Sequence, residues 1–155
     1  TDEAPDILFE YDPFLESTYG EALMRPHPSY LKSVSSVRHL VKGMAHVTGG
    51  GLLENIPRVL PSGLAALIDY TSWETPQIFR ILQQRGKIPY GEMFRVFNMG
   101  IGMVMVCAKE NADTILSNLV DSKIIGSIIE QNQEGSTQVI IENFEYKDKF
   151  NESFD

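Results

Sequence analysis

The sequence has little cysteine and no long apolar run. Its one cysteine, Cys107, lies within an apolar stretch, so a single chain can form neither a disulfide nor a cysteine-based zinc site. This scarcity suits a reducing compartment, and we expect a cytoplasmic protein. No apolar stretch reaches the ~20 residues of a membrane span. The sequence does not show the basic start and following apolar block that are typical of a secretory signal. We also expect no membrane partner.

Positive charge is also scarce. The chain has 13 Lys and Arg against 21 Asp and Glu, which gives a formal net charge of −8. This balance disfavours nucleic acid or an anionic membrane as the main partner, because both require a basic face. It does not exclude a local phosphate site, since backbone N–H groups bind phosphate without Lys or Arg.

Several catalytic and metal motifs are missing. The histidines His27, His39 and His46 have no metal-ligand spacing, so no metal ligand is predicted. The sequence has no P-loop, no Gly-x-Ser-x-Gly elbow and no Ser-His-Asp order. We expect His39 on a solvated helix face and His27 in a loop between two prolines. His46 alone lies beside a glycine-rich turn.

The 155 residues fit one domain, with 43% apolar and 22% charged residues. Seven acidic residues precede the first basic one, Arg25, and we interpret residues 1–27 as an acidic connecting arm with one short helical turn. Residues 28–145 are predicted to form the domain, and 146–155 a polar tail. The chain lacks an initiator Met, which leads us to expect a piece of a longer protein.

Apolar periodicity predicts an α+β fold. Helices are expected at 29–42, 52–60, 75–84, 92–97 and 111–120, and strands at 44–47, 64–70, 101–108, 123–130 and 138–144. Gly43 is predicted to end the first helix, and Pro57 to kink the second or end its first part. The last two strands, joined by Gln-Glu-Gly-Ser, are predicted to form a hairpin. We expect helices packed on a mixed sheet of about four to six strands.

The segment 45–61 carries the strongest chemical signal and reads AHVTGGGLLENIPRVLP. Three successive glycines cost conformational entropy, so they favour a place where backbone approaches a ligand closely or adopts positive φ. The N–H groups of the following helix start favour an anion. His46 and Thr48 would flank that point, and the first helical turns carry Glu54, Asn55 and Arg58. The alternative is a tight turn capped by Thr48.

A second segment, 92–103, reads EMFRVFNMGIGM. Asn98, Gly100 and Gly102 fall at a predicted helix-to-strand junction. The order of the glycines does not fit a dinucleotide fingerprint. The alternative is a glycine turn that brings the strand close to a neighbour. Trp73 and Cys107 are interpreted as packing residues.

Together these segments resemble the C-terminal domain of the phosphoribosylformylglycinamidine cyclo-ligase family. The resemblance is carried by HVTGGG at 46–51, ENIPRVLP at 54–61, EMFR at 92–95 and FNMGIGM at 97–103. Weaker similarity at 19–23, 30–34 and 124–126 extends it over roughly residues 18–143. One departure is Pro26-His27-Pro28-Ser29-Tyr30, where the family usually reads Pro-Thr-x-x-Tyr, and this alters the local capping.

The resemblance implies a ligase of purine biosynthesis that requires ATP and Mg²⁺. ATP phosphorylates the formamide oxygen of formylglycinamidine ribonucleotide, and an amine of the same molecule closes the ring. Aminoimidazole ribonucleotide, ADP and phosphate are released. The family pairs this domain with an N-terminal domain that dimerises and supplies much of the ATP site. Nothing here matches that half, so the chain alone is expected to be inactive and its complete enzyme to be a nucleotide-binding homodimer.

Residue roles follow from the resemblance and the chemistry of phosphoryl transfer. His46 and Asn98 are predicted to be catalytic, the first stabilising transferring charge and the second fixing an amide-like group. The predicted substrate or phosphate contacts are Thr48, Gly49, Gly50, Gly51, Glu54, Asn55, Arg58 and Gly100. Two alternatives stay open: a related domain of formylglycinamidine synthase or of selenide or thiamine-monophosphate kinases, and a non-catalytic binding module. The Glu-Asn-Ile-Pro-Arg run favours the cyclo-ligase.

Overall fold

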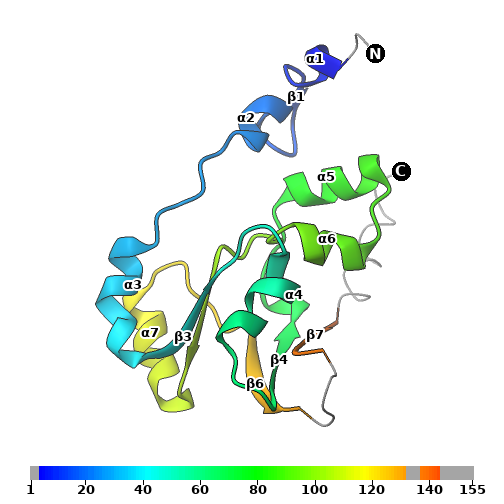
Figure 1. Ribbon diagram of the computed structural model, residues 1–155. Coiled ribbons are helices and arrows are strands. Elements are labelled where there is room, and N and C mark those ends of the chain that lie inside the picture. Colours follow the sequence, from blue (N-terminus) through cyan, green and yellow to red (C-terminus); the bar gives the residue numbers. More distant parts are fainter. Residues whose placement is uncertain (1–3, 132–136, 144–155) are drawn as a thin grey trace.

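The computed structural model describes residues 4–131 and 137–143 (Figure 1). Its helices are α1 (Ala4–Ile7), α2 (Tyr19–Leu23), α3 (Leu31–Val37), α4 (Gly51–Asn55), α5 (Gln77–Gly86), α6 (Tyr90–Val96) and α7 (Ala112–Asn118). Its 3₁₀ turns are η1 (Arg38–Leu40), η2 (Pro57–Val59), η3 (Tyr70–Ser72) and η4 (Lys109–Asn111). Its strands are β1 (Tyr11–Asp12), β2 (Ser17–Thr18), β3 (Val41–His46), β4 (Leu64–Asp69), β5 (Met103–Cys107), β6 (Gly126–Glu130) and β7 (Val139–Glu142). The predicted α+β class is confirmed, and the predicted tail lies outside the described residues.

The strands of the domain divide into two sheets instead of the single mixed sheet expected. β3 pairs with β5 antiparallel, and β4 lies between an antiparallel β6 and a parallel β7. The predicted hairpin of the last two strands is therefore wrong. The physical reason is the apolar β4, which buries Ala65, Ala66 and Ile68 and accepts a partner strand along each edge.

The boundary between the first helix and the first strand of the domain also differs from the prediction. The helix ends at Val37, and β3 begins at Val41 and continues through Gly43, so the prediction that Gly43 ends a helix is wrong. Pairing with β5 decides this, because Gly43 is paired with Val106, after a register shift between Val41 and Gly43. Pro57, by contrast, separates α4 from η2, as predicted.

The core lies where β3, β4, β5, α4 and α6 meet. In Figure 1, α3 and α7 lie to the left of β3, and α4 lies to its right. Tyr70 lies at the centre of an aromatic group, with its ring edge-on to Trp73 at 5.1 Å and to Phe94 at 4.9 Å between centroids. Around this group pack the buried residues Ala45, Val47, Leu52, Ile56, Ala66, Ile68, Met93, Met99, Val104 and Val139.

Residues 4–24 form a separate arm, joined to α3 by an extended link (Figure 1). The arm holds two helices and a two-residue strand pair, which is more structure than the single helical turn expected. Tyr19 ties it to α5: its hydroxyl donates to Asp12 Oδ2 at 2.6 Å and accepts from Arg85 at 2.9 Å. The Arg85 guanidinium also lies 4.6 Å from the centre of the Tyr19 ring, within range of a cation–π contact.

Within the part of the chain that the structure covers, no helix has the length and apolar character that crossing a bilayer requires.

Candidate functional site

The two glycine segments that the sequence singled out lie against each other. His46 faces Met103 in the pairing of β3 with β5, and Val47 N–H donates to the Gly102 carbonyl at 2.9 Å. Gly51 has φ +56°, and a Cβ there would overlap the carbonyl oxygen of Phe94. A side chain at this position is therefore excluded by both backbone conformation and space. We name this contact between the turn 48–51 and residues 94–102 the glycine junction.

Asn55 holds the turn from inside. Its side chain is 4% exposed, and its Nδ2 donates to the carbonyls of Gly51 at 2.8 Å and Gly49 at 3.1 Å. The Thr48 carbonyl accepts from Gly51 N–H at 3.0 Å. The N-cap of α4 is Gly50, with no side-chain cap, so the alternative in which Thr48 caps the helix does not hold.

These bonds leave only part of the turn open to a ligand. Because Gly51 N–H is used within the turn, it cannot donate outward. The N–H groups of Gly49 and Gly50 have no hydrogen-bond partner among the described residues. Glu54 Oε2 lies 2.7 Å from the position that a Cβ of Gly50 would take. This carboxylate stabilises the start of α4, and an anion bound at the turn would have to displace it.

The second segment forms its own tight turn. Asn98 Oδ1 accepts from Gly100 N–H at 2.9 Å, while the side-chain nitrogen of Asn98, Nδ2, has no hydrogen-bond partner within the described residues. Gly100 has φ +96°, and a Cβ there would lie 2.5 Å from Cδ of Pro76. The Met99 carbonyl accepts from Trp73 Nε1 at 2.9 Å. The side-chain amide of Asn98 is therefore available to donate to a ligand, on a turn held in place by its contacts with Trp73 and Pro76.

His46 is part of a cluster that sequence reasoning missed. Its Nε2 lies 2.9 Å from Nε2 of His27, and the ring of Tyr30 lies edge-on to both imidazoles. The Tyr30 hydroxyl occupies the space that a Cβ of Gly102 would fill. Burial raises the pKa of Tyr30, which keeps this hydroxyl protonated. His27 and His46 are 19 positions apart, so no spacing rule could have paired them.

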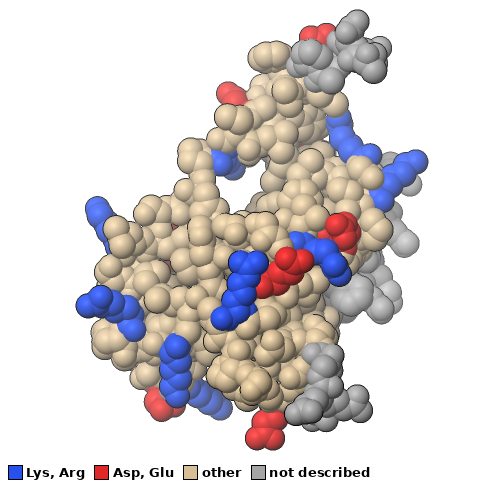
Figure 2. Space-filling model, viewed as in Figure 1, with Lys and Arg blue, Asp and Glu red and all other residues tan. Residues whose placement is uncertain are grey.

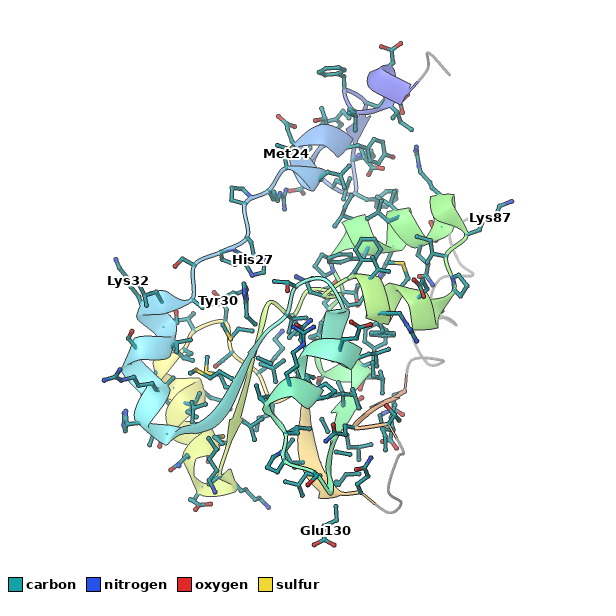
Figure 3. All side chains as sticks on the ribbon, viewed as in Figure 1. Met24, His27, Tyr30, Lys32, Lys87 and Glu130 are labelled. Carbon is teal, nitrogen blue, oxygen red and sulfur yellow. The ribbon has the colours of Figure 1, made fainter. Side chains whose placement is uncertain are left out.

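Figure 3 shows His27 and Tyr30 where the link from the arm reaches α3. We name His27, Tyr30 and His46 the histidine cluster. Both histidines are exposed, whereas Tyr30 is half-buried. His27 is in a loop, as predicted, and His39 is exposed, as predicted.

The predicted site residues divide into a surface group and a supporting group. Exposed members are His46, Thr48, Gly49, Glu54, Arg58 and Gly100, whereas Gly51 and Asn55 are buried and Gly50 and Asn98 are half-buried. Arg58 lies in η2, and among the described residues no hydrogen bond or ion pair links its side chain to the turn. On the face of the molecule that Figure 2 shows, basic side chains are interspersed with acidic ones and form no continuous basic surface. Nowhere in residues 4–131 and 137–143 do three His, Cys, Asp or Glu side chains gather to hold a metal ion.

Comparison with known proteins gives one family. The family model described as AIR synthase related protein, C-terminal domain, matches residues 4–138. A phosphoribosylformylglycinamidine cyclo-ligase of Caldicellulosiruptor bescii is 42% identical over 142 residues, covering 90% of this chain and 42% of the relative. The enzyme of the same name from Citrifermentans bemidjiense is 50% identical over 109 residues, covering 69% of this chain and 31% of the relative.

A bifunctional purine biosynthetic protein of Schizosaccharomyces pombe is 48% identical over 102 residues, covering 64% of this chain and 13% of the relative. The chain thus spans less than half the length of the curated relatives it matches. The family model covers both the arm and most of the domain. The chain belongs to the family of AIR synthase related proteins and corresponds to their C-terminal domain.

Proposed function

We propose that this chain is the C-terminal part of a cytoplasmic ATP-dependent cyclo-ligase of purine biosynthesis. Its reaction converts formylglycinamidine ribonucleotide to aminoimidazole ribonucleotide. The observation that carries the proposal is the glycine junction, which brings together two segments that resemble the family most specifically. The match of the family model over residues 4–138, and relatives named for this activity, support it.

The proposed reaction has two steps. The terminal phosphoryl group of ATP passes to the formamide oxygen of the substrate, and ADP leaves. An amine of the same molecule then attacks the activated carbon, which closes the ring and releases phosphate. Such chemistry depends mainly on positioning and on donors aimed at developing charge.

The exposed side of the glycine junction offers such donors. We assign substrate or nucleotide contacts to the ring of His46, the N–H groups of Gly49 and Gly50, and the free amide of Asn98. Thr48, Glu54, Arg58 and Gly100 would border the same ligand. Gly51 and Asn55 would act by holding the turn in shape.

Among the described residues, no three His, Cys, Asp or Glu side chains gather to hold a metal ion, so we assign no Mg²⁺ ligand to this chain. We derive no step through the metal, and propose that Mg²⁺ and ATP are held largely by an N-terminal domain of the complete enzyme. A contact with that domain is supported by the arm, where Phe9 is 79% and Met24 80% exposed. Large apolar side chains gathered on one exposed unit are typical of protein–protein contacts. Homodimerisation through the same N-terminal domain is part of the proposal.

Co-expression tests the activity. The chain would be produced together with the N-terminal domain of a relative such as the Caldicellulosiruptor bescii enzyme, and the co-purified complex assayed for ATP-dependent formation of aminoimidazole ribonucleotide. We expect turnover from the complex and none from either part alone. A stable complex that binds ATP and substrate but does not cyclise would contradict the proposal.

Two substitutions in that complex test the site. His46→Ala and Asn98→Ala should each lower kcat by about 10²-fold, as removal of a single charge-stabilising donor typically does. His39→Ala is the matched control, since His39 is exposed and lies in η1. Unchanged turnover in either variant would remove that residue from the assignment.

A further inference from the structure

The histidine cluster contains a proton-sharing pair. A hydrogen bond between two imidazole nitrogens requires an N–H on one ring and a lone pair on the other. The 2.9 Å between Nε2 of His27 and Nε2 of His46 lies within the range of such a bond. One of the two rings therefore carries its proton on Nε2, and the other, when neutral, carries it on Nδ1.

The surroundings of His27 hold this geometry in place. Pro26 and Pro28 flank it, and a proline fixes its own φ and keeps the preceding residue extended. The ring of Tyr30 packs against both imidazoles, at 5.5 Å from that of His27 and 6.1 Å from that of His46. The absence of a side chain at Gly102 leaves room for Tyr30 to make these contacts.

We propose that His27 is a positioning residue that sets the tautomer of His46. In this arrangement His27 donates its Nε2–H to Nε2 of His46, and His46 carries its own proton on Nδ1. The nitrogen that His46 offers to a ligand is then Nδ1–H, a donor suited to a phosphoryl or carbonyl oxygen. The direction of the bond rests on the proposed function, since the reverse direction would present a lone pair to a negatively charged oxygen.

Neutral histidine without a fixed partner exchanges its proton between the two ring nitrogens. The bond to His27 removes this freedom, because His46 Nε2 must remain unprotonated to accept. In metal sites, removal of the partner that orients a ligating histidine costs about 10- to 100-fold in affinity or activity, and we expect a loss of that size here. His27 would act through His46, without touching the substrate.

The experiment is ¹⁵N NMR of the imidazole nitrogens in the 155-residue chain, recorded at mildly alkaline pH. We expect His46 to show a single Nδ1–H tautomer. His27→Ala should convert His46 to a mixture of tautomers, and His27→Gln, whose side-chain amide can donate to His46 Nε2, should restore Nδ1–H. The nitrogens of His39 serve as the internal control.

Two results would overturn the inference: an Nε2–H tautomer of His46 in the wild type, or an Nδ1–H tautomer that stays unchanged in His27→Ala. A second readout uses the cyclising complex, where His27→Ala should lower kcat at least tenfold with KM nearly unchanged, and His27→Gln should recover most of it. An inactive wild-type complex refutes the proposed function but leaves the tautomer result standing. An active complex in which His27→Ala keeps the wild-type kcat refutes the positioning role alone.

Discussion

Helix α4, which begins at the glycine junction, and helix α2 of the N-terminal arm are both five residues long, yet they are held in different ways. Helix α4 buries Leu52 and Asn55, whereas α2 buries no side chain. Isolated helices this short are marginal in water. Helix α4 depends on contacts with the core. Helix α2 is held by the capping box between Thr18 and Glu21, and by the hydroxyl of Tyr19, which bonds Asp12 and Arg85. Damage at the junction should therefore spread through the domain, and damage in the arm should stay local.

The largest effect is expected from Gly51→Ala. The added methyl would overlap the Phe94 carbonyl, at a residue with φ +56°. We expect a loss of at least about 4 kcal/mol of unfolding free energy, or no folded protein. Gly49→Ala is the matched control, because no atom lies within 4 Å of its Cβ position. Urea unfolding followed by circular dichroism compares the two, and similar losses in both would show that the junction is not tightly packed.

Asn55→Ala should have the next largest effect. It leaves the inward carbonyls of Gly49 and Gly51 without their donor, at a cost of about 2 to 3 kcal/mol. Asn118→Ala provides the comparison, since that exposed amide bonds a single carbonyl, that of Thr114 in α7. Its cost should stay within about 0.5 kcal/mol. Equal costs in urea unfolding would contradict the supporting role of Asn55.

Gly102→Ala should have a moderate effect. The new methyl would displace the Tyr30 hydroxyl, which lies at the end of a side chain that can move. We expect about 1 to 2 kcal/mol of destabilisation, as for modest overpacking. The NMR signals of His27 and His46 should shift in this variant, and those of His39 should not. Unshifted signals would mean that Tyr30 does not support the histidine pair.

The smallest effect on the domain is expected from Tyr19→Phe in the arm. It removes the bonds to Asp12 and Arg85, so amide exchange should accelerate in residues 4–24 while urea unfolding of the domain stays unchanged. Tyr11→Phe, at an exposed ring, is the control. A fall in domain stability after Tyr19→Phe would show that the arm and the domain unfold together.

The same contact predicts a dependence on pH. The hydrogen bond from Tyr19, followed by backbone bonds from Phe14 and Leu15, lowers the pKa of Asp12. A lowered carboxyl pKa stabilises the folded arm above the ordinary Asp value of about 3.9, and this contribution is lost as the pH falls through the folded pKa. Arm protection, corrected for intrinsic exchange, should therefore decrease on acidification, and less so in Tyr19→Phe.

Local patterns predicted the elements whose ends are set locally. β4, α5 and α7 occur close to where apolar periodicity placed them, and Pro57 divides its helix. Strand partners were not predictable in this way, because β7 follows β6 in the sequence but pairs with the far edge of β4. Gly43 became part of a strand for the same reason, since β5 supplied a partner from more than sixty positions away.

The site was predicted unevenly. The sequence pointed to both glycine segments, and the structure brings them together. It did not separate residues that face outward, such as His46, from residues that support the turn, such as Asn55. That distinction depends on which carbonyls converge on the amide of Asn55. His27 was missed as a partner of His46 because their contact requires the arm link to return to the end of β3.

Trp73 is the only tryptophan of the chain. Its indole is buried, and the N–H donates to the Met99 carbonyl directly behind the glycine junction. A shielded, hydrogen-bonded indole emits at shorter wavelength than one in water. The protein therefore carries an intrinsic optical reporter, whose emission colour follows the packing of this junction without any added label.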